Sequence, residues 1–296
     1  MRKRFFVIFV MAIIVFPLTA CTPKVVEAPL FTLESLPTID GSTVTIPMDE
    51  ALVAKLTRKT VEEVRPYVLH NKTHEAYVNL IEGKADLIFV TSPSEGELAL
   101  AASSGVEMEI VPIVSEAFIF LTHKDNPVSS LTFKQIVDIY SGSITKWSQV
   151  GGSDQEIVPF QRPVNSGSQT GFLDLVMKKV TPMTPPSEWV FAGMGDLIEA
   201  VADYENGPTA LGYSYYYFVT DMWGNDQVKL MKVDGIYPDK KTIANKSYPI
   251  QTAYYAVYRK TEAQDSDVRK IVTWILSKEG QQLMEDSGYV ICLYLI

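Results

Sequence analysis

Asp40-Gly-Ser-Thr-Val-Thr-Ile-Pro47 (the first loop) and Gln161-Arg-Pro-Val-Asn-Ser-Gly-Ser-Gln-Thr-Gly171 (the second loop) are hydroxyl-rich segments that each lead into a helical pattern. Backbone N–H groups at the start of a helix attract negative charge, and Ser and Thr hydroxyls add rotatable donors. Arg162 supplies a planar cation that suits an oxyanion. Either loop alone is more typical of a turn with a helix cap. Together the two loops predict one anion site.

The N-terminus has the features of a lipoprotein signal. Met1-Arg-Lys-Arg4 is basic, residues 5–18 are apolar but too few for a comfortable transmembrane helix, and Leu18-Thr-Ala-Cys21 resembles a lipobox. We expect a signal peptide over residues 1–20, a lipidated Cys21 and a flexible tether over 21–36. The protein would then lie on the extracytoplasmic face of the cell membrane. An ordinary signal peptide next to a free cysteine is the alternative.

The chain is acidic. It carries 26 Lys and Arg against 35 Asp and Glu, a net charge of -9, and removal of residues 1–20 would take away three basic residues and leave -12. This balance argues against nucleic acid or an anionic membrane surface as the partner, because both favour basic patches. A bound anion must therefore be held by local donors.

Strand and helix patterns alternate along the chain. Residues 85–91 form a continuous apolar run that is typical of a strand covered on both faces. Other expected strands are 109–114, 117–122, 156–160, 210–218, 228–233 and 252–258, and expected helices are 73–82, 97–104, 133–140, 170–180 and 265–277. The alternation predicts an α/β class, and the length is more than one compact core usually holds.

Several residues outside the two loops favour structural interpretations. Asp86 is more typical of a strand edge than of a ligand contact, and the aromatic residues 213–218 favour core and hinge packing over a sugar-stacking platform. His70 and His74 could share a metal only on one continuous helix, so we expect surface histidines. The sequence holds no nucleophile motif and no phosphate loop ending in Gly-Lys-Ser/Thr. We therefore expect no enzyme activity, no metal and no cofactor.

The sequence resembles the phosphate-binding proteins of bacterial phosphate ABC importers and, more broadly, the type II solute-binding proteins. The most specific motif is Arg162 followed, four residues on, by Ser166-Gly-Ser168. The resemblance covers nearly the whole mature chain, through the first loop, Gly83-Lys-Ala-Asp86, Asn126-Pro-Val128, Ile139-Tyr-Ser-Gly-Ser-Ile-Thr-Lys-Trp147, Val150-Gly-Gly152, Leu211-Gly-Tyr-Ser214, Val233-Asp-Gly235 and the closing segment from Gly280 to Tyr289.

The resemblance implies a type II periplasmic-binding-protein fold. Two α/β lobes would be joined by two crossover strands, with a ligand cleft between them and lobe closure on binding. We expect lobe 1 at residues 37–118 plus 222–296 and lobe 2 at 119–221. The crossovers would then fall near 117–122 and near 213–218.

The resemblance also implies which residues contact the ligand. These are Ser42, Thr43, Thr45, Ile46, Thr73, Thr91 and Ser92 from lobe 1, with the amides of Val44 and Ile46, and Arg162, Ser166, Gly167 and Ser168 from lobe 2. A structural ion pair is the alternative for Arg162. The best-known phosphate binders carry an Asp that accepts the proton of hydrogen phosphate, where this chain reads Thr91-Ser-Pro-Ser94. Its absence weakens discrimination against sulfate-like dianions, and Glu95 is the next carboxylate.

The implied function is that of a lipid-anchored monomer that captures phosphate or a similar tetrahedral oxyanion and passes it to ABC permease subunits. A surface signalling or adhesion lipoprotein that reuses the fold is the alternative. An enzyme acting on phosphate esters is a third possibility, which lacks the residues for catalysis.

Overall fold

The computed structural model describes residues 28, 30–178, 180–203 and 208–292. The expected signal peptide, Cys21 and residues 21–27 and 29 of the expected tether lie outside the described residues. The described end of that tether packs on the protein: Phe31, Leu33 and Leu36 contact the core, and the Phe31 amide donates to the Leu56 carbonyl at 3.1 Å. Within the described ranges, no helix combines the length and the apolar character needed to cross a membrane.

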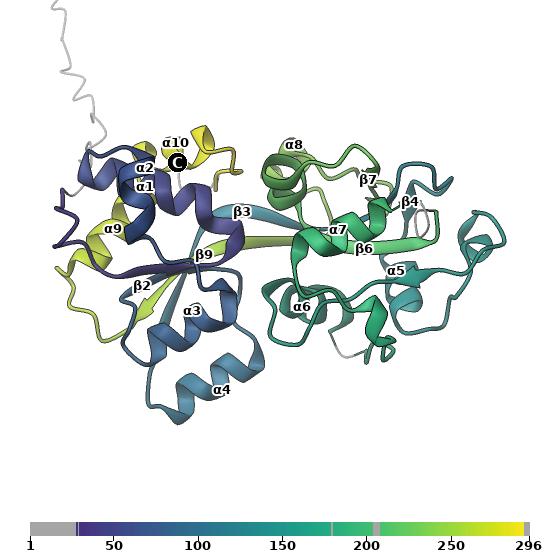
Figure 1. The fold of residues 1–296 in the computed structure, drawn as a ribbon, viewed down its shortest axis with the longest axis horizontal. Helices are drawn as coiled ribbons and strands as arrows, with labels where there is room; N and C mark the ends of the chain where they lie inside the picture. The colour runs from purple at the N-terminus through teal and green to yellow at the C-terminus, as the bar shows by residue number, and fades with distance from the viewer. Residues whose placement is uncertain (1–27, 29, 179, 204–207, 293–296) are drawn as a thin grey trace, which may run out of the picture.

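One long strand, β3 (Met108–His123), runs through both halves of the molecule (Figure 1). Its residues 108–117 pair antiparallel with β9, and its residues 118–123 pair antiparallel with β6 and β7. The strand order is β1-β2-β9-β3-β6-β5. The other strands of this sheet are β1 (Ile39–Gly41), β2 (Leu87–Val90), β5 (Val158–Pro159), β6 (Ala210–Tyr215), β7 (Val228–Leu230) and β9 (Gln251–Arg259).

Helices cover the sheet in two separate groups, which form two lobes (Figure 1). The first lobe contains β1, β2, η1 (Thr43–Thr45), α1 (Ile46–Thr57), α2 (Val61–Val64), η2 (Arg65–Tyr67), α3 (Lys72–Ile81), α4 (Glu95–Ser103), α9 (Asp267–Ile275) and α10 (Lys278–Asp286). The second contains β5, β6, β7, α5 (Phe133–Tyr140), η3 (Trp147–Val150), α6 (Gly167–Gly171), the π-helix η4 (Phe172–Met177), η5 (Ser187–Trp189), α7 (Met194–Ala202), the π-helix η6 (Phe218–Trp223) and α8 (Lys240–Ala244).

The α/β class and the two-lobe arrangement agree with the sequence analysis. The second crossover, where the chain returns to the first lobe, was expected near residues 213–218 but lies further along the chain. The strand β7 pairs with the second half of β3, and β8 (Lys232–Val233) pairs with β4 (Ser130–Leu131). Residues 228–244, expected in lobe 1, therefore lie in lobe 2. The chain returns through β9, because the aromatic strand at 210–215 pairs only within lobe 2.

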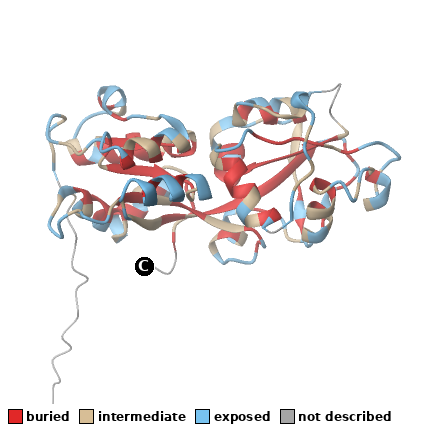
Figure 2. Ribbon diagram, turned by 90° about the horizontal axis from the view of Figure 1, so that it is seen from below, coloured by how far each residue is buried: buried red, intermediate tan, exposed pale blue. Residues whose placement is uncertain are grey.

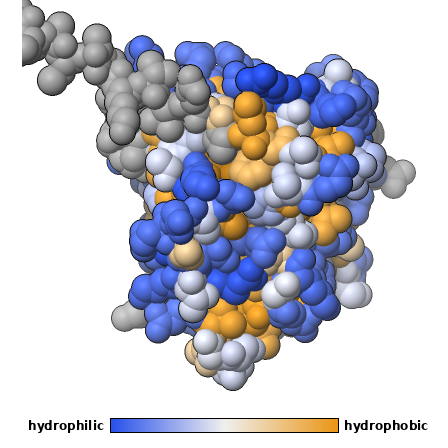
Figure 3. Space-filling view, turned by 90° about the vertical axis from the view of Figure 1, so that its left-hand side faces the viewer, coloured by the Kyte–Doolittle hydropathy of each residue, from blue (hydrophilic) through white to orange (hydrophobic). Residues whose placement is uncertain are grey.

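Buried residues follow the central strands of both lobes (Figure 2). In the second lobe the core is aromatic: the rings of Phe172 and Tyr213 stack at 4.7 Å, and Phe118 meets Tyr215 edge to face at 5.5 Å. Such pairs stabilise a core beyond their buried area. At the outer end of the first lobe, hydrophilic residues cover most of the surface, with small apolar groups between them (Figure 3).

Glu116 is a buried carboxylate at the point where β3 passes between the lobes. Its Oε1 accepts from the Ala117 amide at 2.7 Å, and its Oε2 accepts from the Tyr217 amide at 3.3 Å, which ties β3 to the segment after β6. Burial raises the pKa of Glu116 to about 7 in spite of these hydrogen bonds.

The Glu116→Gln variant tests this pKa. The folded protein binds one more proton than the unfolded chain between the ordinary pKa of 4.5 and about 7. The stability that this proton confers is complete below pH 4.5 and is lost as the pH rises through about 7. The unfolding free energy of the parent minus that of Glu116→Gln should therefore fall by up to about 3 kcal/mol between pH 4 and 8.

Urea denaturation at several pH values measures this difference. Glu62→Gln, which replaces an exposed carboxylate of α2 by the same amide, is the matched control. A constant or rising difference for Glu116→Gln would show that the pKa of Glu116 is not raised in the folded protein.

Candidate functional site

A cavity of about 820 Å³ lies between the two lobes. The first loop and the start of α3 form one wall, and the second loop, the start of α7 and part of η6 form the other. The two loops therefore face one another across the cleft. Among the residues that line the cavity are Ser42, Val44, Thr73, His74, Thr91, Arg162, Gly167, Ser168, Met194, Asp196, Phe218, Met222 and Trp223.

The two lobes touch at Gly167. A Cβ atom on Gly167 would lie 2.4 Å from Thr73 Oγ1 and 2.6 Å from Thr91 Oγ1, so a larger residue would push the lobes apart. The hydroxyl of Tyr215 donates to the Gly167 carbonyl at 2.8 Å and fixes the loop at this point. The contact brings hydroxyls of the first lobe next to the arginine of the second.

Arg162 is buried and its guanidinium is held in place by its own lobe. Nε donates to the Phe191 carbonyl at 2.7 Å, one Nη donates to the Ala192 carbonyl at 2.8 Å, and the other donates to Ser168 Oγ at 3.2 Å. A guanidinium has five N–H groups, so two remain for a ligand. The fork is therefore oriented before a ligand arrives.

The charge of Arg162 has no direct counter-ion in the part of the chain that the structure describes. Burial lowers the pKa of the Arg162 guanidinium, and interactions with Tyr213 and Asp196 partly offset this lowering. No carboxylate of the described residues lies within ion-pair distance of Arg162. An arginine stays protonated in proteins all the same. A buried cation without a partner is costly, so the site favours an anion strongly.

Two buried hydroxyls of the first lobe face the same cavity. Ser42 Oγ has no hydrogen-bond partner among the described residues, and Thr91 Oγ1 has none of good geometry, although it lies near the Tyr215 hydroxyl. A buried hydroxyl without a partner costs about 1–3 kcal/mol, and that cost disappears when a ligand oxygen binds it. Together with Arg162 they form a donor set drawn from both lobes.

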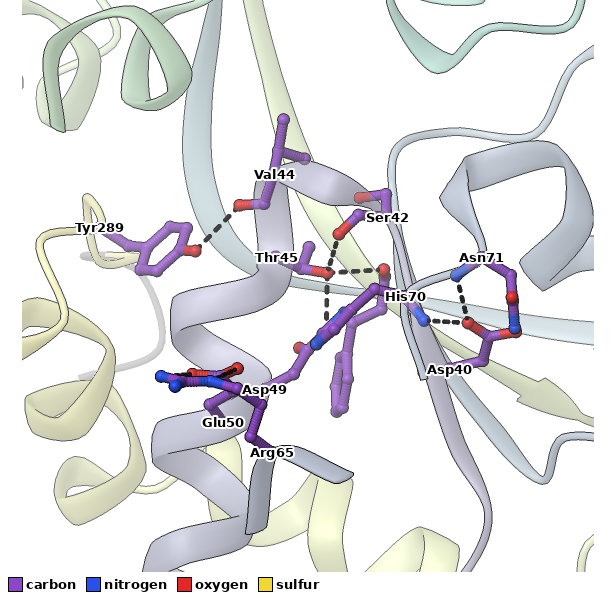
Figure 4. Close-up of polar contacts among 12 residues, drawn as sticks. Asp40, Ser42, Val44, Thr45, Asp49, Glu50, Arg65, His70, Asn71 and Tyr289 are labelled. Atoms are coloured by element: carbon purple, nitrogen blue, oxygen red, sulfur yellow. Dashed lines mark hydrogen bonds and ion pairs between the residues drawn. The ribbon is translucent and has the colours of Figure 1, made fainter. Parts of the chain in front are cut away.

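Asp40 ties the first loop to the start of α3 (Figure 4). Its Oδ1 accepts from the amides of Gly41 and Asn71 at 2.7 and 3.0 Å, and its Oδ2 accepts from the side-chain amides of Asn71 and Asn79 at 2.9 and 2.8 Å. Each oxygen of the Asp40 carboxylate thus accepts two hydrogen bonds from groups of its own lobe. Asp40 positions the ligand loops and does not itself face the ligand.

Thr45 belongs to the first loop but is buried within its own lobe and does not line the cavity; Figure 4 shows its hydrogen bonds. Its Oγ1 lies 3.0 Å from the carbonyls of Ser42 and Phe89 and 2.8 Å from Asp49 Oδ2. One hydroxyl proton cannot serve three acceptors, which favours a neutral, protonated Asp49. Burial also raises the pKa of Asp49 well above its ordinary value. The neutral form removes one negative charge from beside the first loop.

Most of the residues expected at the site line the cavity. They are Ser42, Thr43, Thr73, Thr91, Arg162, Ser166, Gly167 and Ser168. Thr45, Ile46 and Ser92 do not line it. The hydroxyl of Thr45 is used by the fold, and Ile46 begins the α1 helix behind the loop. Asp86 has the structural role expected of it, since it accepts from Arg259 at 2.8 Å and from the Thr38 amide at 3.0 Å.

The two histidines expected on the surface are placed differently. His74 lines the cavity, and its Nδ1 lies 3.0 Å from the buried Glu97, whose other oxygen accepts from the Ser94 amide at 2.7 Å. His70 is half-buried behind the first loop, 3.7 Å from Asp49 Oδ2, and burial lowers its pKa. Across the described ranges, no group of three His, Cys, Asp or Glu is placed to hold a metal ion.

Both sides of the cleft contain a non-glycine residue with left-handed backbone. Lys72, directly before Thr73, has φ 69°, and Asn165, directly before Ser166, has φ 68°. Asn tolerates this conformation better than Lys, and such strained residues gather at ligand sites. The bend sends the following hydroxyl and amide groups into the cavity. Sequence reasoning missed these residues because neither is a glycine.

A family model described as a PBP superfamily domain matches residues 36–279. The chain belongs to the PBP superfamily. Among curated relatives, this PBP superfamily protein is 28% identical to the phosphate-binding protein PstS of Bacillus subtilis over 56% of its own length and 52% of the relative's. It is 25% identical to the PstS of Staphylococcus epidermidis strain RP62A over 85% and 77%, respectively.

Solved structures agree with this assignment. A protein from Clostridium perfringens, described as a phosphate ABC transporter substrate-binding protein and solved with bound phosphate, has 26% identity and a TM-score of 0.62, covering 86% of this chain and 98% of that one. An ABC-type phosphate transport receptor from Vibrio cholerae has 21% identity and a TM-score of 0.64, covering 86% and 100%. The resemblance to phosphate-binding proteins is confirmed, and the names of these relatives describe binding and transport rather than catalysis.

The Gly167→Ala variant tests the contact between the lobes. The added methyl group meets two hydroxyls at 2.4 and 2.6 Å, so the lobes should settle further apart. Double electron–electron resonance between spin labels at Leu100 and Glu188, one on each lobe, measures the distance between the lobes. We expect a longer and broader distance distribution than in the parent.

Gly96→Ala is the matched control, because a Cβ there meets nothing closer than 3.7 Å. It should reproduce the parent distribution. An unchanged distribution for Gly167→Ala would mean that the lobes do not meet at this residue in solution.

Proposed function

We propose that this protein captures phosphate or a similar tetrahedral oxyanion in the cleft and passes it to a membrane ABC importer. Arg162 supplies the positive charge from lobe 2, and Ser42, Thr73 and Thr91 supply neutral donors from lobe 1. A ligand that joins donors of both lobes stabilises the closed form by its extra contacts in that form.

The observation that carries this proposal is the buried guanidinium of Arg162 without a carboxylate partner. Two of its N–H groups remain for a ligand, and the hydroxyls of Ser42 and Thr91 line the same cavity. An oxyanion satisfies all of these groups at once, whereas a neutral or cationic ligand leaves the buried charge uncompensated. The names of the similar proteins from Bacillus subtilis and Clostridium perfringens support phosphate as the anion.

His74 offers the proton acceptor that the Thr91–Ser94 stretch lacks. An ionised carboxylate can only accept, so Glu97 holds a proton on His74 Nδ1, and in the neutral imidazole Nε2 is then an acceptor. An acceptor in the cleft favours hydrogen phosphate, which carries a proton, over sulfate, which does not. We expect His74→Ala to lower the ratio of the Kd for sulfate to the Kd for phosphate, as measured by isothermal titration calorimetry.

The place of the protein in the cell is part of the same proposal. The lipobox-like Leu18-Thr-Ala-Cys21 supports lipid anchoring at Cys21 on the extracytoplasmic face, with the binding lobes held near ABC permease subunits as a monomer. Retention of the protein in the membrane fraction, and its release after Cys21→Ser, tests the anchor separately from ligand binding.

The Arg162→Ala variant tests the site. Loss of two charge-assisted hydrogen bonds should weaken phosphate binding by about 3 kcal/mol or more, at least about a hundredfold in Kd, as measured by isothermal titration calorimetry. Lys241→Ala removes an exposed cation from the same lobe and should leave the Kd unchanged. Thr91→Val keeps the shape, removes a donor of the other lobe and should weaken binding about tenfold.

Two results would overturn the proposal. The first is no heat with phosphate, sulfate or molybdate. The second is an unchanged Kd for phosphate after Arg162→Ala. Weakening by Arg162→Ala but not by Thr91→Val would confine the site to lobe 2 and would exclude a ligand that bridges the lobes.

A further inference from the structure

The cavity is much larger than one small oxyanion requires. Its volume of about 820 Å³ falls in the range of about 300–1,000 Å³ that is usual for organic ligands. The lobes touch at Gly167, beside the arginine end of the cavity, while the rest of the cavity stays open in this structure. Part of the cavity therefore lies beside the anion-binding end, and its walls indicate what it holds.

An apolar wall continues directly from the arginine. The carbonyls of Phe191 and Ala192 accept from Arg162, and the chain then leads through Gly193 into Met194 at the start of α7. Met194, Phe218, Met222 and Trp223 line the cavity from this lobe, and Val44 faces them from the other. One ligand can therefore meet the cation and the apolar wall at the same time.

Trp223 is held rigidly although its side chain is partly exposed. Its indole Nε1 donates to Glu199 Oε1 at 2.6 Å, and its ring stacks on Phe218 at 5.7 Å with an interplanar angle of 27°. It also packs against Gly195, where an added Cβ would come within 2.2 Å of the ring. Its relative exposure is nonetheless 44%. A fixed aromatic face of this kind can stack on a ligand without ordering a flexible side chain.

The π-helix η6 produces this arrangement. Phe218 and Trp223 are its first and last residues, and the Gly224 amide donates to the Val219 carbonyl, five residues back, at 3.1 Å. The wider turn of a π-helix brings residues five apart closer together than an α-helix does, and such turns are frequent at functional sites. The wall is thus built by local backbone geometry and does not depend on lobe closure.

We infer that the natural ligand is an oxyanion that carries an apolar or aromatic group, such as a phosphate monoester or a phosphonate. The oxyanion binds Arg162 and the hydroxyls, and the organic group packs on Trp223, Phe218 and the methionines. This inference rests on the proposed function, because the anion end of the cavity provides the anchor. Inorganic phosphate fits the same anchor but leaves the apolar wall uncovered.

Methylphosphonate and phenylphosphonate are the probes, because they share one anionic group and differ only in the substituent. Isothermal titration calorimetry should give phenylphosphonate about a tenfold lower Kd than methylphosphonate, from ring burial and stacking. Trp223→Ala should remove this difference while changing the Kd of methylphosphonate less than twofold. Trp223→Phe should keep most of it. Tyr67→Ala, which removes an exposed aromatic outside the cavity, is the matched control and should change neither Kd.

Equal Kd values for the two phosphonates would overturn the inference, and so would an equal loss for both after Trp223→Ala, which would mark Trp223 as purely structural. In either case phosphate binding that depends on Arg162 would leave the proposed function standing. If phosphate and both phosphonates fail to bind, the proposed function and this inference fall together.

Discussion

The buried charge of Arg162 is the constraint on which the rest of the site depends. Three of its N–H groups are used by the carbonyls of Phe191 and Ala192 and by Ser168, which fix the guanidinium without neutralising it. The buried positive charge therefore favours the binding of an anion from solution. The acidic character of the whole chain sharpens this requirement, since only local donors make the cleft attractive to an anion. The neutral form of Asp49 serves the same end on the opposite lobe.

The sheet explains how one anion can meet both lobes. Because β3 runs through both halves and the chain returns to the first lobe at the start of β9, a small change of twist in these strands is enough to move the walls of the cleft. The sequence predicted the α/β class from strand and helix alternation, and the family resemblance implied the two lobes. The expected boundary put residues 228–244 in the wrong lobe, because neither the strand pattern nor the resemblance identifies the partner of each strand. Only the pairing of β7 with β3 decides that point.

The candidate site shows the same limit. Arg162 and Ser166 could be named from the cation and hydroxyls of the second loop, which suit an anion, and Thr73 could be named from the family resemblance. Thr45 has the same chemistry, yet its hydroxyl is used within its own lobe by Asp49 and Phe89. Trp223 could not have been found, since its position depends on a π-turn and on the absence of a side chain at Gly195. Motifs thus predict donors, and packing decides which of them face the ligand.

A crystal structure of the protein with arsenate, located by its anomalous signal, tests the central claim most directly. Arsenate is tetrahedral like phosphate, so it should occupy the same donors. The account predicts one arsenic site whose oxygens lie within hydrogen-bonding distance of Arg162 from lobe 2 and of Ser42 and Thr91 from lobe 1. An arsenic site that contacts only one lobe, or none in the cleft at saturating arsenate, would contradict it.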